Sequence, residues 1–150
     1  MAEVAFYHCL TTSVDEALVT ILDKILSLQE RAVVMTPYLE RIEHLDQFLW
    51  RFKANSFLPH GTEKDGFSEH QPVFLTNIEY VPNKARFLVL VDGAESKDPN
   101  HYRRVIEVFN GGNEEEVARS RQRWRDYKKN DLNLIYFRQT EDKSWIKQSS

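Results

Sequence analysis

The sequence predicts an α/β fold, with a doubly wound, mostly parallel sheet flanked by helices. Strand-like apolar runs and helical periodicities alternate from the first residues onward, at 4–9, 14–28, 32–36 and 37–51. The strand runs are also almost continuously apolar, which is typical of parallel strands covered on both faces. The whole chain, 1–150, has a length that suits one domain with one core.

The first half of the chain supplies two strand–helix pairs. Residues 4–9 (VAFYHC) and 32–36 (AVVMT) are rich in apolar and β-branched side chains, and both predict buried strands. Apolar side chains recur at helical spacing over 14–28, after a Thr-Thr-Ser segment that offers N-caps. Pro37 suits the first position of a second helix, which is expected to reach about Arg51.

The second half is less regular. Residues 53–71 combine glycines, proline and polar side chains, and predict a long loop of a kind that is uncommon unless functional. Residues 139–150 are expected to form a loose C-terminal tail, although Trp145 and Ile146 could dock. Four further apolar runs predict strands, at 72–76, 85–91, 104–109 and 132–138.

A highly charged stretch before the last predicted strand indicates a third helix. Gly111 and Gly112 suit a turn, and Asn113 is a good N-cap. Three acids, Glu114–Glu116, open the helix and basic residues fill its second half, an order that complements the helix macrodipole.

One face of this third helix stands out. Four side chains fall on a narrow face at 100° per residue: Val117, Ser120, Trp124 and Tyr127. Three bases lie beside it: Arg121, Arg125 and Lys128. These charges could simply face solvent. Alternatively, Arg121 and Arg125 could grip carboxylates while Trp124 supplies an apolar wall, so that the face binds an acidic ligand with an apolar end.

Composition limits the classes of partner and compartment. The net charge of −3 means that the protein as a whole does not attract nucleic acid, so any phosphate or acid must be bound by a local patch, of which 119–129 is the densest. The single cysteine, Cys9, excludes an intramolecular disulfide. With no signal-like start and no membrane-length apolar run, we expect a soluble cytoplasmic protein that does not insert in a membrane.

The sequence predicts no cofactor site. The architecture is Rossmann-like, but no glycine-rich nucleotide motif is present, and Glu114–Glu116 would repel a phosphate beside Gly111-Gly112. None of the five histidines lies in a metal-binding spacing, although His60 and His70 share a loop with three acids. Polar surface histidines are the better interpretation, so we expect no bound metal.

Catalytic constellations are also weak. His8 and Cys9 are adjacent on a predicted strand and therefore point to opposite faces. Asp92-Gly93 follows a strand, where a catalytic carboxylate is plausible, but a turn is favoured. The chain is expected to be noncatalytic.

A second aromatic segment runs from Leu45 to His60 (LDQFLWRFKANSFLPH). Trp50 lies near the expected helix end, and Phe52, Phe57 and Leu58 continue into a polar loop. A packed loop anchor and an exposed contact patch are equally compatible with this pattern.

These segments resemble the chi subunit family of bacterial DNA polymerase III. The resemblance covers nearly the whole chain and begins with the FYH-like strand at 6–8. Its most specific part is the pattern L-D-x-x-L-W-x-x-x-x-x-S-F-x-P-H, which carries Trp50 and Phe57. The R-x-R-x-x-x-Y-K-x-x-x-x-N-L-like end of the third helix is also present, from Arg123 through Tyr127 to Asn133 and Leu134.

The resemblance implies a noncatalytic accessory protein of the clamp-loader complex. Such proteins bind the acidic C-terminal tail of single-stranded DNA-binding protein, which ends in Asp residues followed by Pro and Phe. The family's tail-binding positions fall on Arg121, Trp124 and Arg125, whereas Val117 stands where a base is frequent. Contacts with the psi subunit of the clamp loader, or with a DNA-repair helicase, fall on Trp50 and Phe57.

Two other functions compete with this one. The first is a direct nucleic-acid-binding protein that uses the basic 119–129 helix, although sequence-specific nucleic-acid binding is not expected. The second is a small α/β enzyme that uses Asp92 or the His60 loop.

Overall fold

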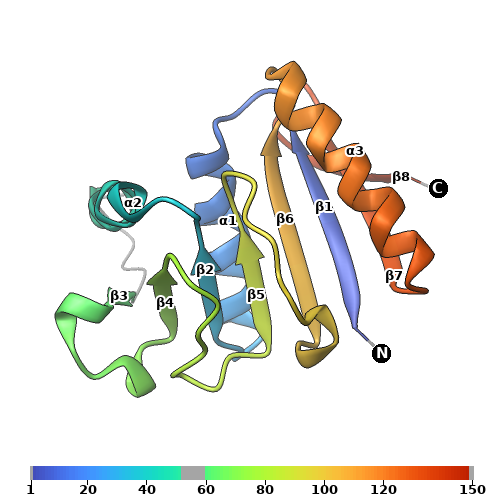
Figure 1. Cartoon of the computed structure of the whole chain (residues 1–150). Helices are drawn as coiled ribbons and strands as arrows, with labels where there is room; N and C mark the ends of the chain where they lie inside the picture. Colours follow the sequence, from blue (N-terminus) through green and yellow to red (C-terminus); the bar gives the residue numbers. More distant parts are fainter. Residues whose placement is uncertain (1, 52–59, 149–150) are drawn as a thin grey trace.

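A computed structural model describes residues 2–51 and 60–148, which form one eight-stranded sheet in the order β3-β4-β2-β5-β6-β1-β7-β8 (Figure 1). The strands are β1 Glu3–Cys9, β2 Ala32–Met35, β3 Gly61–Thr62, β4 Val73–Thr76, β5 Phe87–Leu90, β6 Arg104–Asn110, β7 Asn133–Gln139 and β8 Trp145–Gln148. All neighbouring strands pair in parallel except β7 and β8, which are antiparallel. The predicted mostly parallel α/β class is therefore confirmed; a closer likeness to Rossmann domains stays a prediction.

Helices lie on both faces of this sheet. The α-helices of the described ranges are α1 Val14–Ser27, α2 Leu39–Arg51 and α3 Glu114–Lys129. Successive residues of β1 divide between the two layers: Ala5 and Tyr7 pack in the core under α1 and α2, whereas Val4 and Phe6 pack in the core under α3. In Figure 1, α3 lies in front of the β7 side of the sheet, with β1 and β6 visible beside it, and α1 lies behind the sheet.

Side-chain caps fix where two helices begin. Ser13 Oγ accepts a hydrogen bond from the Glu16 backbone N–H at 3.1 Å, and α1 starts at the next residue, as predicted. Asn113 Oδ1 accepts from the backbone N–H groups of Glu115 and Glu116 at 3.0 and 3.1 Å, which confirms it as the cap of α3. The acids of that first turn and the lysines of the last turn match the helix dipole.

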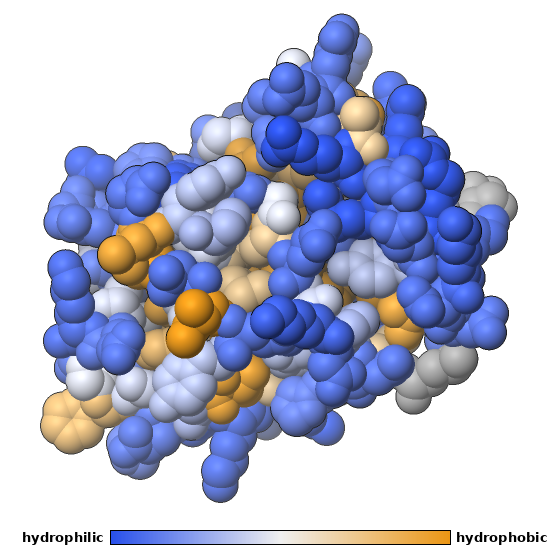
Figure 2. Space-filling view, in the orientation of Figure 1, coloured by the Kyte–Doolittle hydropathy of each residue, from blue (hydrophilic) through white to orange (hydrophobic). Residues whose placement is uncertain are grey.

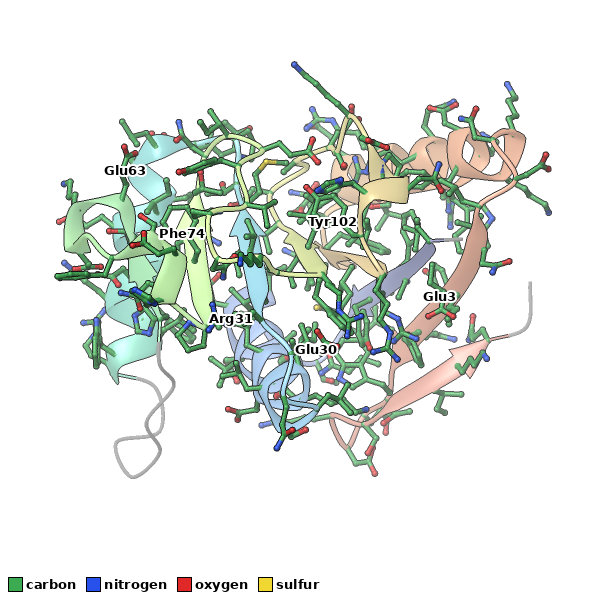
Figure 3. All side chains as sticks on the ribbon, turned by 90° about the horizontal axis from the view of Figure 1, so that it is seen from below. Glu3, Glu30, Arg31, Glu63, Phe74 and Tyr102 are labelled. Carbon is green, nitrogen blue, oxygen red and sulfur yellow. The ribbon has the colours of Figure 1, made fainter. Side chains whose placement is uncertain are left out.

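Ion pairs hold the amino ends of several strands. Glu30 follows α1 and pairs with Arg86 and Arg103, the latter at 3.2 Å, while Glu3 of β1 pairs with Arg104 of β6. Figure 3 looks at this edge from below and labels Glu3 and Glu30. Three arginines at this end of the sheet, Arg86, Arg103 and Arg104, are thus matched by the chain's own acids.

The C-terminal segment differs from the expected loose tail at 139–150. Residues 145–148 form β8 on the edge of the sheet, and Trp145 packs edge-on against Tyr7, with ring centroids 5.0 Å apart. The side chain of Gln139 is buried, and its Oε1 accepts from the backbone N–H groups of residues 10–12 at 2.9–3.1 Å. Apolar packing and a satisfied buried amide anchor the segment.

The predicted long loop at 53–71 also contains more structure than expected. Within its described part, β3 pairs with β4, and two short 3₁₀ helices follow at Glu63–Asp65 and Ser68–His70; a third occurs at Pro99–His101. Across residues 2–51 and 60–148, no helix has the length and apolar character needed to cross a membrane.

Candidate functional site

A pocket of about 300 Å³ opens between α3 and the sheet. We call it the α3 pocket. Its walls come from both sides of that junction: Phe6, Phe109, Val117, Ser120, Arg121, Trp124, Arg125, Tyr136 and Gln148. Four of the five positions predicted for an acidic tail, namely Val117, Arg121, Trp124 and Arg125, therefore come together. The fifth, Lys128, is exposed further along α3 and does not line the pocket.

Aromatic rings form the apolar part of the α3 pocket. The ring of Trp124 meets Phe6 edge-on, with centroids 5.3 Å apart, and meets Tyr136 in the same way at 5.8 Å. Trp124 is only partly buried, so some of the indole stays accessible from the pocket. This arrangement can receive a flat apolar group and hold it against ring edges and faces.

Within the described part of the chain, the two arginines at the pocket are not paired with any acid. Arg121 is exposed and makes no ion pair or hydrogen bond within residues 2–51 and 60–148. Arg125 Nη2 donates to the neutral side chain of Gln122, to Oε1 at 2.9 Å. Both guanidinium groups therefore remain available to carboxylates from outside.

Other arginines of the same helix are already engaged. Arg123 Nε donates to Glu107 Oε1 at 2.5 Å, and its Nη2 donates to Ser120 Oγ at 3.1 Å. Glu107 lies on β6 beneath α3, and burial raises the pKa of its carboxyl while the charge of Arg123 opposes that rise. Arg119 pairs with Glu115 at 3.6 Å on the exposed side. Arg123 thus fastens the helix to the sheet, and it is not a free cation.

A histidine that the sequence did not implicate supports the pocket wall. His8 Nδ1 shares a hydrogen bond with the Tyr136 hydroxyl, and its ring stacks on Phe109 with centroids 4.8 Å apart. Burial, together with the charges of Arg138 and Arg121, lowers the pKa of His8, so the imidazole is neutral at pH 7. The sequence signal was limited to the FYH strand, because the His8–Tyr136 contact depends on the pairing of β1 with β7.

The second predicted contact surface is only partly visible. Trp50, at the end of α2, is 55% exposed, and its ring centroid lies 4.7 Å from that of His60. His60 itself is buried, with Nε2 at 3.0 Å from Asp46 Oδ1. Phe57 lies outside the described residues. The structure therefore places Trp50 at the surface, near the end of α2.

The competing catalytic candidates have structural roles. Asp92 lies in a turn with φ of 57°, and its Oδ2 accepts from Thr36 Oγ1 at 2.8 Å and from Arg41 Nε at 2.9 Å. Arg41 also binds Asp15, at 2.7 Å. Cys9 is buried, and burial, with Glu116 nearby, raises the pKa of its thiol to about 12, so it stays protonated at pH 7.

Histidine, cysteine and carboxylate side chains are the usual protein ligands of metal ions. In the described ranges, 2–51 and 60–148, no three or more of them are arranged to hold a metal ion. The charged clusters that the structure does show are ion pairs within the chain.

Comparison with known proteins identifies the family of the chain. The chain is 25% identical over 109 residues to a protein named "Probable DNA polymerase III subunit chi" from Rickettsia prowazekii (strain Madrid E). That alignment spans 73% of this chain and 66% of the relative. The family model described as "DNA polymerase III chi subunit, HolC" matches residues 1–135, which include α3 and most of the α3 pocket. The chain therefore belongs to the DNA polymerase III chi subunit family.

Proposed function

We propose that this protein is a noncatalytic accessory subunit of the DNA polymerase III clamp-loader complex. It binds the acidic C-terminal tail of single-stranded DNA-binding protein in the α3 pocket and so tethers the replication machinery to coated single strands in the cytoplasm. One observation carries the proposal: the guanidinium group of Arg121, which pairs with no acid among the described residues, lies at an apolar pocket walled by the partly buried ring of Trp124.

The chemistry of the pocket suits the end of such a tail. A volume of about 300 Å³ is at the small end of ligand pockets and is enough for one aromatic side chain with its neighbours. The terminal ring would contact Trp124 and Phe6, and the terminal and aspartate carboxylates would pair with Arg121 and Arg125. Arg–carboxylate pairs are often bidentate, which adds orientation as well as affinity.

Free nucleic acid fits this surface less well. A phosphate-binding helix would present several unpaired cations in a row, whereas Arg119 and Arg123 are occupied by Glu115 and Glu107. Figure 2 shows a largely hydrophilic surface over α3 on a protein whose net charge is −3, so long-range attraction of a polyanion is weak. The apolar pocket also has no role in phosphate binding.

A second partner would use the other end of the molecule. Trp50 is exposed at the end of α2, on the opposite side of the sheet from α3, and its segment matches the family position that contacts psi or a DNA-repair helicase. Phe57 belongs to the same proposed surface. Two partners on different faces would let the subunit bridge the clamp loader and the coated strand.

Mixing the protein with single-stranded DNA-binding protein tests this function directly. We expect a complex with the intact partner and none with a partner that lacks its last few residues, including the terminal Phe. Trp50→Ala should retain the complex because Trp50 does not line the α3 pocket. Equal binding of the intact and truncated partners would refute the proposal and would favour contact with another part of the partner or with its DNA.

A further inference from the structure

A second hollow on the surface adjoins the α3 pocket. This hollow, of about 450 Å³, lies over β7 and β8, and Gln148 lines both, so the two abut at that residue. We call it the β7–β8 hollow. Most of its lining comes after residue 135, where the family match ends, so the match does not assign it a role.

The register of the strands explains this continuity. Tyr136 pairs with Gln148 across β7 and β8, and Arg138 pairs with Ile146 in the next row on the same face. Successive rows on one face lie roughly 7 Å apart along a strand. Arg138 and Ile146 therefore lie one row beyond the wall of the α3 pocket.

Charge gives the β7–β8 hollow the same character as the α3 pocket. Arg138 is exposed and forms no ion pair with any acid in the described ranges. Arg121 and Arg138 both act on the pKa values of His8 and Tyr136, so both guanidinium groups lie near this hydrogen-bonded pair. Beside Arg138, Leu10 and Ile146 are 43% and 54% exposed and provide apolar contact.

From these observations we infer that the β7–β8 hollow receives the residues upstream of the peptide's end, with Arg138 pairing with a second set of carboxylates. This inference rests on the proposed function, because the same acidic peptide occupies both hollows. A chain leaving the α3 pocket needs only a few extended residues, at about 3.3 Å each, to reach the next row. Glu141 also lines the β7–β8 hollow, and its negative charge repels acidic residues there.

A path for the acidic peptide out of the α3 pocket in the other direction, toward the C-terminal end of α3, is less suitable. The hollow on that side shares no lining residue with the α3 pocket and is bordered by Glu95, Asp98 and Asp126. An acidic chain passing there would meet three carboxylates against one lysine, Lys97, because Arg123 is held by Glu107.

Two synthetic peptides test the path. The short one is Asp-Asp-Pro-Phe, and the long one carries four further upstream residues, two of them Asp; both are labelled at the N-terminus and titrated by fluorescence polarisation. We expect the long peptide to bind about 3–10-fold more tightly, the range of one exposed charge pair or slightly more. Arg138→Ala should remove this gain and leave the short peptide unchanged within about twofold.

Matched variants separate a specific path from general attraction. Lys128→Ala removes an exposed cation further along α3, outside the lining of both hollows, and should preserve the gain, whereas Glu141→Gln should increase it. Equal affinity for the two peptides, a gain that survives Arg138→Ala, or a gain abolished by Lys128→Ala would each overturn the inference while leaving the proposed function in place. If neither peptide binds, the proposed function itself fails, and the inference fails with it.

Discussion

Two arginines of α3, two residues apart in the chain, lie in opposite electrostatic settings. Arg123 turns toward the sheet, where the buried carboxylate of Glu107 compensates it at 2.5 Å. Arg121 turns to the α3 pocket, where the described part of the chain supplies no acid. The difference shows that a basic helix is not one binding surface. Only uncompensated cations can bind an external carboxylate without first breaking an internal pair.

The largest expected effect comes from breaking the compensated pair. Glu107→Ala leaves Arg123, whose side chain is only 11% exposed, without its partner, and should reduce the free energy of unfolding by about 3–5 kcal/mol. Urea denaturation measures this change. The double variant Glu107→Ala/Arg123→Ala should lose less than the sum of the single variants because no uncompensated charge remains.

The control for this pair is on the same helix. Glu115→Ala removes the exposed partner of Arg119 and should change stability by less than about 0.5 kcal/mol. If Glu107→Ala were as mild as Glu115→Ala, the buried pair would not be what fastens α3 to the sheet.

The uncompensated arginine should show the reverse pattern. Arg121→Ala should weaken binding of the Asp-Asp-Pro-Phe peptide by about 1.5–3 kcal/mol, the range for hydrogen bonds to charged groups, with little change in stability. Arg119→Ala is the matched control, because it removes the same charge from an exposed position already paired with Glu115. A fluorescence titration in which the two variants behave alike would mean that charge alone, without position, accounts for binding.

These settings explain what the sequence could and could not predict. Helix starts depend on local caps, so the role of Asn113 as the N-cap of α3 could be predicted from the sequence. The helical period likewise placed Trp124 beside Arg121 and Arg125. The ion pair of Arg123 with Glu107 could not be predicted from the sequence, because Glu107 reaches Arg123 only when β6 packs beneath α3. The contact of His8 with Tyr136 likewise joins residues 128 positions apart.

The docking of the C-terminal segment follows the same rule. The sequence shows Trp145 and Ile146 as apolar side chains in a polar stretch. Where they pack depends on the antiparallel pairing of β8 with β7, which the alternating β/α pattern does not predict. Residues that serve long-range pairing carry no local signal of it. This is why the α3 pocket was predicted in outline and the β7–β8 hollow was not.

The smallest expected effect concerns the field that the uncompensated arginines create at His8. Burial and the charges of Arg138 and Arg121 hold the pKa of the folded state below its ordinary value, so the unfolded chain binds the His8 proton more readily. The contribution of His8 to stability is therefore fully present above the unfolded-state pKa of about 6.5 and is lost as the pH falls below it. His8→Gln should flatten this part of the stability profile relative to the unmodified chain.

Titration of His8 by NMR separates burial from the field. If Arg121 is uncompensated, Arg121→Ala must raise the pKa of His8, because removal of a nearby positive charge favours the imidazolium. Arg119→Ala serves as the comparison, since Arg119 lies on the exposed side of α3, pairs with Glu115 and is not among the charges that act on the pKa of His8. An unchanged His8 pKa in Arg121→Ala would mean that the guanidinium is screened or neutralised in solution. Arg121 would then resemble Arg123, and the electrostatic basis for binding an acidic tail would be lost.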